Sequence, residues 1–329
     1  MSNEQLAEIL AELALDPVMF VETMLDVKPE QWQREFLRNV MDNPRCAVKS
    51  GHGVGKTAVL SWHILWWLLT RHPCKVVCTA NTAHQLSDVL WSEVKKWGRR
   101  LPEAFYSQLE MKSDKINLEG ASDSYAVARV SRRENPEALQ GFHSDNLLFI
   151  IDEASGVDDM IFEVGEGSLS TPNAKVVMTG NPTRTSGYFF NAFSAMRDRW
   201  TLMTVACKDS SQVAPEYIED MGIKYGDDSN VYRVRVLGEF PRAEDDTVIP
   251  LYMVDSSLNR DVQVDPYTPV VWGLDVANFG SDRTALCKRR GNEVVEPIKT
   301  WQGKDLMETV GMIVQEYEMC KYKDRPTDI

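Results

Sequence analysis

One segment, "VKSGHGVGKTAVL" from Val48 to Leu60, carries most of the information about the fold. Lys56 and Thr57 follow Gly55 directly, the order of a phosphate-binding loop in which the lysine contacts the β and γ phosphates and the hydroxyl meets Mg²⁺. Glycines in such a loop let backbone N–H groups turn toward the anion. A strand before the loop and a helix after it complete the pattern, and the helix presents its positive end to the phosphates. The segment predicts a nucleotide site.

The loop departs from the G-x-x-x-x-G-K-[ST] pattern at its first position, which is Ser50. Serine is small, and we expect that this junction needs small size more than it needs the absence of a Cβ. Gly51 would then absorb the unusual backbone dihedral. His52 is interpreted as a residue at the loop tip and not as a ligand or a base. The predicted nucleotide-binding residues are Gln33, Ser50, Gly51, His52, Gly53, Val54, Gly55, Lys56 and Thr57.

A second motif, "NLLFIIDEA" from Asn146 to Ala154, ends an apolar run with two adjacent acids. Carboxylates at the end of a buried strand are costly unless a metal or a substrate uses them. We assign Asp152, with Thr57, to Mg²⁺, and Glu153 to the polarisation of the attacking water. Lys56 and Glu153 are therefore the predicted catalytic residues, and the two motifs together predict an ATPase that uses ATP and Mg²⁺.

Two shorter segments fit the same site. "KPEQWQREF" offers Gln33, or Gln31, together with Trp32, an amide and an aromatic ring suited to adenine. "VVMTGNPT" ends a third apolar strand with Thr179, Gly180 and Asn181, where a polar amide can sense the γ-phosphate. We interpret these three residues as part of the nucleotide site; a plain Asn-Pro turn is the alternative.

The rest of the chain predicts an α/β fold. Continuous apolar strands alternate with helices, as in a mostly parallel sheet with helices on both faces. Strands are expected at 45–49, 75–80, 125–130, 146–152, 174–180 and 200–206, with "KINL" as a further strand and helices at 56–70 and 83–100. After an acidic, proline-containing linker, strands at 270–277, 284–290 and 293–301 and a helix at 305–321 are expected, and no final element in "RPTDI".

Composition excludes several classes of function. The net charge of −13 does not suit a protein that coats DNA through bulk positive charge, although local basic clusters remain. Six scattered cysteines without C-x-x-C pairs predict reduced thiols and neither a zinc site nor a disulfide framework. The longest apolar stretch, "AVLSWHILWWLL" (58–69), is too short to span a membrane, and the N-terminus does not resemble a secretory signal.

In the order and content of its motifs the chain resembles the large subunit of tailed-phage terminases, the genome-packaging motors. The resemblance covers nearly the whole chain, and a small residue other than glycine at the first loop position is familiar in that family. The segments that carry it are "DPVMFVETMLDVKPEQWQREFL", "SGHGVGKT", "TANTAHQLSDVLWSEV", "FIIDEA", "TGNPT", "YRVRVLGEFP" and "WGLDVANFGSDRTAL".

The resemblance implies a P-loop NTPase fold of the additional-strand, RecA/helicase-like type, followed by an RNase H-like nuclease. The implied parts are a helical segment with the adenine-binding motif (1–44), an ATPase core (45–210), a lid (211–240), a linker (241–269) and an incomplete nuclease domain (270–329). The resemblance also implies that Thr179, Gly180 and Asn181 form the family's coupling motif, in which Asn181 would link hydrolysis to movement. Arg129, Arg132 and Arg133 are the candidates for an arginine supplied to a neighbouring subunit, and the choice among them stays open.

In the family's nuclease, strand-end carboxylates hold two divalent metals, Mg²⁺ or Mn²⁺. Asp275 in "WGLDVA" stands at the first of these positions and would be catalytic and metal-binding, with Asp282 on the following turn. The family's other metal acids lie later in its sequence, so we expect no DNA cleavage by this chain alone.

The implied function is ATP-driven translocation of double-stranded DNA into a procapsid. The implied partners are DNA, a portal protein, a small terminase subunit and further copies in a ring, in the host cytoplasm and not on a membrane. One alternative is a helicase-like or repair ATPase, which would need an aromatic platform for single strands, such as Trp91 and Trp97. The other is an assembly module that binds nucleotide without hydrolysing it.

Overall fold

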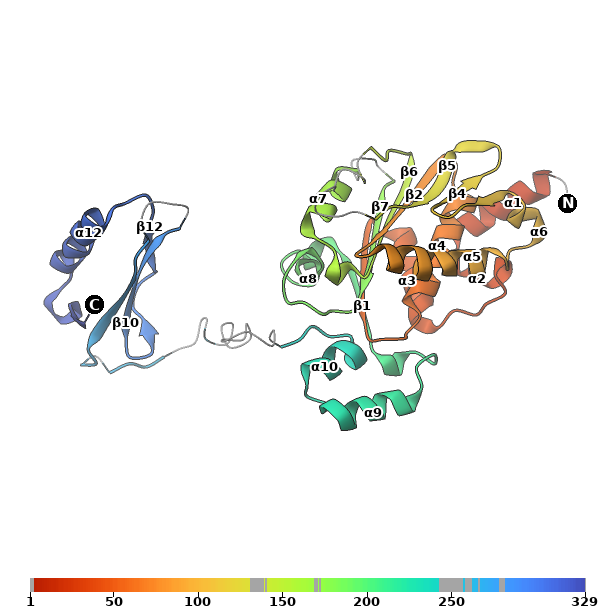
Figure 1. The fold of residues 1–329 in the computed structure, drawn as a ribbon. Coiled ribbons are helices and arrows are strands. Elements are labelled where there is room, and N and C mark those ends of the chain that lie inside the picture. The colour runs from red at the N-terminus through yellow and green to blue at the C-terminus, as the bar shows by residue number, and fades with distance from the viewer. Residues whose placement is uncertain are drawn as a thin grey trace. The chain divides into compact units, whose positions relative to one another are not determined.

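The computed structural model describes residues 3–130, 139, 141–168, 171, 173–242, 257, 262–265, 267–277 and 282–328. The chain forms two compact units, Met1–Tyr252 and Met253–Ile329 (Figure 1). Arg132, Arg133 and most of the predicted linker lie outside the described residues.

The first unit is built on an eight-stranded sheet among the described residues, in the order β3-β4-β5-β2-β6-β7-β1-β8 (Figure 1). All neighbours from β5 to β8 are parallel, whereas β4 pairs antiparallel with both β3 and β5, so β4 alone runs against the other strands of this sheet. This matches the predicted mostly parallel sheet. The strands are β1 (Arg45–Ser50), β2 (Cys74–Ala80), β3 (Leu109–Met111), β4 (Lys115–Leu118), β5 (Ala121–Ala128), β6 (Asn146–Asp152), β7 (Lys175–Gly180) and β8 (Thr201–Val205).

The strand order decides where the motifs meet. β7 lies between β6 and β1, with Lys49 of β1 opposite Gly180 and Ile151 of β6 opposite Met178. Because parallel strands end at the same edge, the phosphate loop after β1, the acids after β6 and the coupling motif after β7 share one edge of the sheet. Sequence predicted β1, β6 and β7, but it predicted neither β3 nor this order.

Helices cover both faces of the sheet. On β6, Leu148 and Ile150 pack into one apolar cluster, and Leu147, Phe149 and Ile151 pack into another, as the alternation of side chains along a strand requires. The first cluster receives α1 (Asn3–Leu15), α2 (Pro17–Met24), α3 (Gln31–Asp42), α4 (Lys56–Thr70), the π-helix η1 (Gln85–Trp91), α5 (Ser92–Gly98) and α6 (Glu103–Tyr106). The second receives α7 (Asp159–Ser168), α8 (Tyr188–Phe193), the short turn η3 (Ala154–Gly156) and Trp200, which directly follows the turn η4 (Arg197–Arg199).

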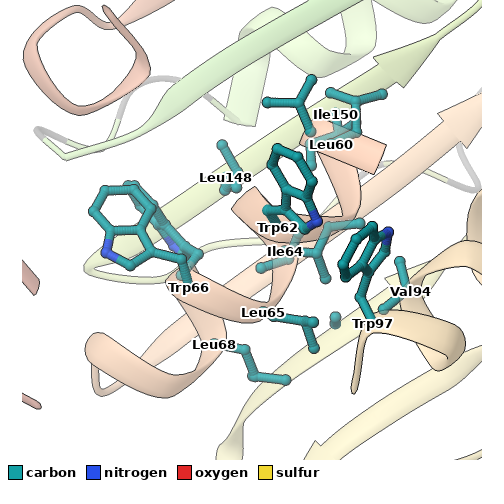
Figure 2. Packing of buried hydrophobic residues seen from close by; sticks show 14 of the residues in the cluster. Leu60, Trp62, Ile64, Leu65, Trp66, Leu68, Val94, Trp97, Leu148 and Ile150 are labelled. Carbon is teal, nitrogen blue, oxygen red and sulfur yellow. The ribbon is translucent and has the colours of Figure 1, made fainter. Parts of the chain in front are cut away.

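Helix α4 is the centre of the first cluster and is apolar around its whole circumference, as a fully buried helix must be. Figure 2 shows Trp62 of α4 against Trp97 of α5, with Leu60 and Ile64 nearby; the two indole rings meet edge to face at 5.2 Å between centroids. This packing holds the first turn of α4, and with it Lys56 and Thr57, in a fixed place relative to the sheet.

Residues 207–240 form a small helical layer with its own core of Cys207, Met221 and Val236. Its elements are the turn η5 (Cys207–Asp209), α9 (Pro215–Tyr225), α10 (Asn230–Tyr232) and the π-helix η6 (Arg233–Leu237). We call residues 211–240 the lid; they belong to the same compact unit as the sheet.

In the second unit the described strands follow the order β11-β10-β9-β13, with β12 also pairing with β10. The expected single strand at 293–301 is wrong: β11 and β12 are separate short strands on β10. The expectation of no final element is also wrong, because β13 pairs with β9 in parallel. The elements are β9 (Val270–Asp275), β10 (Thr284–Arg290), β11 (Glu293–Val294), β12 (Lys299–Trp301), α12 (Leu306–Met319), η7 (Tyr322–Asp324) and β13 (Pro326–Asp328).

Candidate nucleotide site

The phosphate loop has the backbone that its glycines permit. Gly53 and Gly55 have φ angles of 72° and 95°, in the left-handed region that favours glycine. Gly51 does not, so the expectation that it absorbs an unusual dihedral is wrong. Gly51 is instead required by close approach, since a Cβ there would lie 2.8 Å from the carbonyl oxygen of Val236 and 2.9 Å from that of Arg235. Its neighbours are lid residues, which no local sequence signal could reveal.

Ser50 contributes more than small size. The Lys56 ammonium donates a hydrogen bond of 3.1 Å to the Ser50 hydroxyl, which itself donates to the carbonyl oxygen of Gly51 at 2.8 Å. Ser50 and Lys56 are both buried. The hydroxyl therefore holds the lysine at the base of the loop, a contact that glycine at this position could not make.

Asp152 is a buried acid with two hydrogen bonds to the same oxygen. Its Oδ1 accepts from the Thr179 hydroxyl at 2.7 Å and from the backbone N–H of Glu153 at 3.0 Å. Burial, reinforced by the charge of Glu153, raises the pKa of Asp152 to about 6, while Thr179 and Lys56 act in the opposite direction. A bound cation would favour its charged form, so the site suits a divalent metal.

Glu153 has a φ of 50°, in the left-handed region that non-glycine residues seldom occupy. Such a conformation costs about 1–3 kcal/mol and persists where the surroundings enforce it, often at functional sites. Here it lets the chain turn sharply after β6 so that the Glu153 side chain lines the cavity beside the loop. The strain coincides with the residue that sequence assigned to catalysis.

A cavity of about 460 Å³ joins these parts. This volume is within the range of ordinary ligand pockets. The cavity is lined by His52, Gly53, Val54, Gly55, Lys56, Thr57, Ala58, Glu93, Glu153, Asn181 and Gln212. Thr57 and the neighbouring Asp152 offer the oxygen ligands that Mg²⁺ prefers, so the residues present fit a magnesium nucleotide.

The coupling motif contacts both other motifs. The Asn181 side-chain amide donates to the carbonyl oxygen of Ser50 at 2.6 Å, and Thr179 donates to Asp152. Gly180 approaches the next turn closely, since a Cβ there would lie 3.1 Å from the backbone nitrogen of Ala154. Thr179, Gly180 and Asn181 therefore connect the base of the phosphate loop to the acid pair.

Gln33 lies behind the loop. Its Oε1 accepts from the backbone N–H of Glu30 at 2.9 Å, within a capping box at the start of α3, and its Nε2 lies 3.5 Å from the carbonyl oxygen of Gly55. Trp32 is buried, and its indole N–H donates to Glu30. Gln33 does not line the cavity, whereas the side-chain amides of Asn181 and of Gln212 in the lid do, so the assignment of Gln33 to adenine remains a prediction.

His52 lines the cavity at the tip of the loop. Burial, with the charges of Lys56 and Arg235, lowers the pKa of His52 below its usual value. The imidazole is therefore neutral near pH 7.

Sequence reasoning missed Glu93 and Gln212. Glu93 lines the cavity from α5, where its carboxylate accepts from the Trp97 indole N–H at 2.7 Å and the Lys96 ammonium at 2.9 Å. Glu93 lies in the segment "TANTAHQLSDVLWSEV", to which no site role was assigned, and Gln212 lies in none of the quoted segments. Only the packing of α5 and of the lid brings the two residues to the cavity.

Arg129 and Asp275, two other predicted positions, are not among the residues that line this cavity. Arg129 follows β5 and forms an ion pair with Asp114 at 2.7 Å. Asp275 is the last residue of β9 in the second unit, and its side chain is exposed. The side chain of Asp282, which precedes β10, is exposed as well. Over the residues described here, no group of three or more acids, histidines or cysteines is arranged to hold a metal. The predicted nuclease centre therefore remains a prediction.

The family model and a curated relative point to one family. The family model described as "Terminase large subunit, T4likevirus-type, N-terminal" matches residues 49–250. The "Probable terminase, large subunit" of Enterobacteria phage P7 is 27% identical over 293 residues, a match that covers 85% of this chain and 59% of that protein.

Solved structures share the fold. The large terminase of the HK97 bacteriophage has a TM-score of 0.56 at 14% identity, covering 96% of this chain and 74% of that one. A large terminase from a thermophilic bacteriophage, in complex with ADP, has a TM-score of 0.52 at 13% identity, covering 97% of this chain and 76% of that one. The ATPase domain of the Thermus phage P74-26 large terminase has a TM-score of 0.55 at 18% identity, covering 69% of this chain and 99% of that one.

Within the described part of the chain, no helix has the length and apolar character needed to cross a membrane.

Proposed function

The chain belongs to the terminase large-subunit family, T4likevirus-type, whose N-terminal model matches more than half of its residues, and from this we propose that it hydrolyses ATP to drive double-stranded DNA into a procapsid. The observation that carries the proposal is the convergence of the phosphate loop, the acid pair and the coupling motif on one cavity.

In the proposed reaction, Lys56 and the N–H groups of the loop bind the phosphates, and Glu153 accepts a proton from the attacking water. The water oxygen bonds to the γ-phosphorus, the bond from that phosphorus to the bridging oxygen breaks, and ADP and phosphate leave. Mg²⁺, held by Thr57 and Asp152, would supply charge stabilisation. Asn181, bonded to the base of the loop, would pass the change in phosphate occupancy to β7.

Two observations favour this function over the alternatives. Trp91 and Trp97, which a single-strand platform would use, are 1% and 6% exposed, so they cannot stack on bases. Glu153 lines the cavity in a strained backbone conformation, which suits a catalytic base better than a module that only binds nucleotide.

The remaining assignments are part of the same proposal. The strand order β10-β9-β13 with α12 supports a nuclease-type second unit in which Asp275 holds part of a divalent metal pair. From family membership we propose that the protein works with a portal protein and a small terminase subunit in the host cytoplasm. We also propose that it assembles into a ring in which Arg129, Arg132 or Arg133 acts on a neighbouring subunit. The chain spans 59% of the length of its phage P7 relative, so these concern the whole protein.

Steady-state ATP hydrolysis tests the proposal, with Glu153→Ala as the control and with linear duplex DNA and protein concentration as variables. We expect slow hydrolysis that requires Glu153 and rises with DNA or with concentration, since an arginine from a neighbour is worth about 10³–10⁵ in related reactions. Nucleotide binding without hydrolysis in the presence of DNA, portal and small subunit would reject it. Separation of DNA strands by the chain without any capsid component would favour the alternative function, a helicase-like or repair ATPase.

A further inference from the structure

Lys49, at the end of β1 just before the phosphate loop, is a buried lysine that the proposed chemistry does not use. The residue is only 7% exposed, and its ammonium donates to the Glu239 carboxylate, which lies at the end of the lid. The rings of Phe193 and Phe240 lie 5.7 and 5.5 Å from the ammonium nitrogen. One ion pair therefore joins the sheet, the lid and an aromatic cluster.

The lid meets the phosphate loop directly beside this pair. The backbone N–H of His52 donates to the carbonyl oxygen of Arg235 at 2.8 Å, and the Cys207 thiol lies within 3.3 Å of the carbonyl oxygens of both residues. Gly238 has a φ of 66°, and a Cβ there would lie 2.7 Å from the backbone nitrogen of Gly51. Two backbones are thus in contact one residue before Glu239.

Phe240, which follows Glu239, is anchored on α8 and not on the phosphate loop. Phe240 packs against Phe190 and Phe193 with ring centroids 4.9 and 5.7 Å apart, on α8. Across the sheet, Lys49 is the partner of Gly180 in the coupling motif. Lys49 therefore lies between the coupling motif and the lid, and it directly precedes Ser50 in the sequence.

A buried charge at this position is costly. Burial lowers the pKa of Lys49, and the hydrogen bond and charge of Glu239 oppose that shift. Only the lysine end of this pair is buried, since the Glu239 side chain is 40% exposed. Ion pairs that bury a charge contribute little to stability compared with apolar residues of similar volume, and their best-attested use is to fix one arrangement among several. Ala47 and Val48, which precede Lys49 on the same strand, are buried and apolar, so an apolar residue would pack here as well.

We propose that the Lys49–Glu239 pair is a positioning device that fixes the lid on the phosphate loop, so that nucleotide occupancy in the loop changes the arrangement of the lid. The inference rests on the proposed function, since it assigns these residues to the coupling of that same site. Without the pair, the loop still binds nucleotide, but the backbone contacts at Gly51 and His52 no longer hold the lid in one register.

The variants are Lys49→Met and Glu239→Gln, which break the pair, and Lys49→Arg, which keeps it. Lys175→Met is the matched control: Lys175 is another partly buried lysine, but it donates to the carbonyl oxygens of Met41 and Asn43 at the opposite edge of the sheet. Each variant is measured for kcat and KM of ATP hydrolysis, for melting temperature, and for amide hydrogen exchange in residues 215–237 with and without a poorly hydrolysed ATP analogue and Mg²⁺.

We expect the analogue to slow exchange in residues 215–237 of the parent and of Lys49→Arg and Lys175→Met, but not of the two pair-breaking variants. In those two, kcat should fall about tenfold, the scale of coupling lost along such contacts, with KM within about twofold. Lys175→Met should lower the melting temperature alone. Glu239 is 40% exposed, so Glu239→Gln leaves the fold intact if Lys49→Met does not fold.

Three results would overturn the inference: no exchange response to the analogue in the parent, a retained response in both pair-breaking variants, or an equal fall in kcat in Lys175→Met. The exchange measurement does not depend on turnover. A parent that responds to the analogue but never hydrolyses ATP would reject the proposed function and leave the positioning role standing. A parent that hydrolyses ATP with no difference among the variants would reject the positioning role alone.

Discussion

Asp152 and Asp275 occupy similar places in two sheets, and their surroundings differ. Each follows a strand with buried residues, and each was assigned to a metal from sequence. Asp152 is 3% exposed and bonded to Thr179, with Lys56 and Glu153 close enough to alter its pKa. Asp275 is exposed, and the described residues around it form no metal-binding group. An acid at a strand end becomes a site only when neighbouring strands bring other groups to it.

The sharpest test of this comparison replaces each of the two acids by its amide. Asp152→Asn should lower the kcat of ATP hydrolysis about 100-fold or more, since charge stabilisation by a metal is worth several kcal/mol. Asp275→Asn is the matched control and should leave hydrolysis unchanged. The measurement is the steady-state kcat of ATP hydrolysis for both variants and for the parent. Equal losses in the two would mean that the first unit alone does not contain the ATPase site.

A second test concerns whether a buried titratable group implies function. His63 of α4 is fully buried, with its Nδ1 2.8 Å from the carbonyl oxygen of Val59, and burial lowers its pKa to about 4. It lies in the apolar core, so we assign it to packing.

Since the folded pKa of His63 is below that of the unfolded chain, the unfolded state binds more protons between pH 4 and 6.5. The contribution of the neutral His63 to the free energy of unfolding is therefore complete above pH 6.5, and it falls by about 3 kcal/mol as the pH drops to about 4. Denaturant unfolding from pH 4 to 7 of the parent and of His63→Gln should show a smaller slope in the variant. A slope identical to that of the parent would contradict the assignment.

The third test compares glycines in the two units. Gly51→Ala would place a methyl group against two lid carbonyls and the Cys207 sulfur, at a cost of about 1–3 kcal/mol. Gly273→Ala on β9 meets nothing within 4 Å and should cost less than about 0.5 kcal/mol. Urea unfolding, with nucleotide binding as a second readout, separates them. If Gly51→Ala unfolds and binds like the parent, the lid does not pack on the loop as described.

The smallest expected effect belongs to Ser50. Ser50→Ala removes the hydrogen bond to Lys56, worth about 0.5–1.5 kcal/mol, without changing the backbone. We expect KM for ATP to rise by about twofold to tenfold. Ser50→Gly, which also lacks the hydroxyl, is the comparison variant. A loss in Ser50→Gly only would point to backbone rigidity and not to the hydroxyl.

Much of the site could be predicted from sequence because its parts are local. A strand, a glycine loop and a helix form one continuous stretch, and the cavity is lined by Lys56 and Thr57 from that stretch, with Glu153 and Asn181 beside them. The errors and omissions have a common cause. The strand order, the pairing of β13, the reason for Gly51 and the participation of Glu93 and Gln212 all depend on contacts between distant segments.

Local sequence was enough to establish the class of the fold and to predict the chemistry of the nucleotide loop, since apolar periodicity and glycine spacing act over a few residues. Long-range packing settled which neighbours complete each part: β7 between β1 and β6, the lid against Gly51, and Glu239 beside Lys49. The physical reason is that backbone propensities are local, whereas close packing and the pairing of buried charges depend on residues up to 190 positions apart.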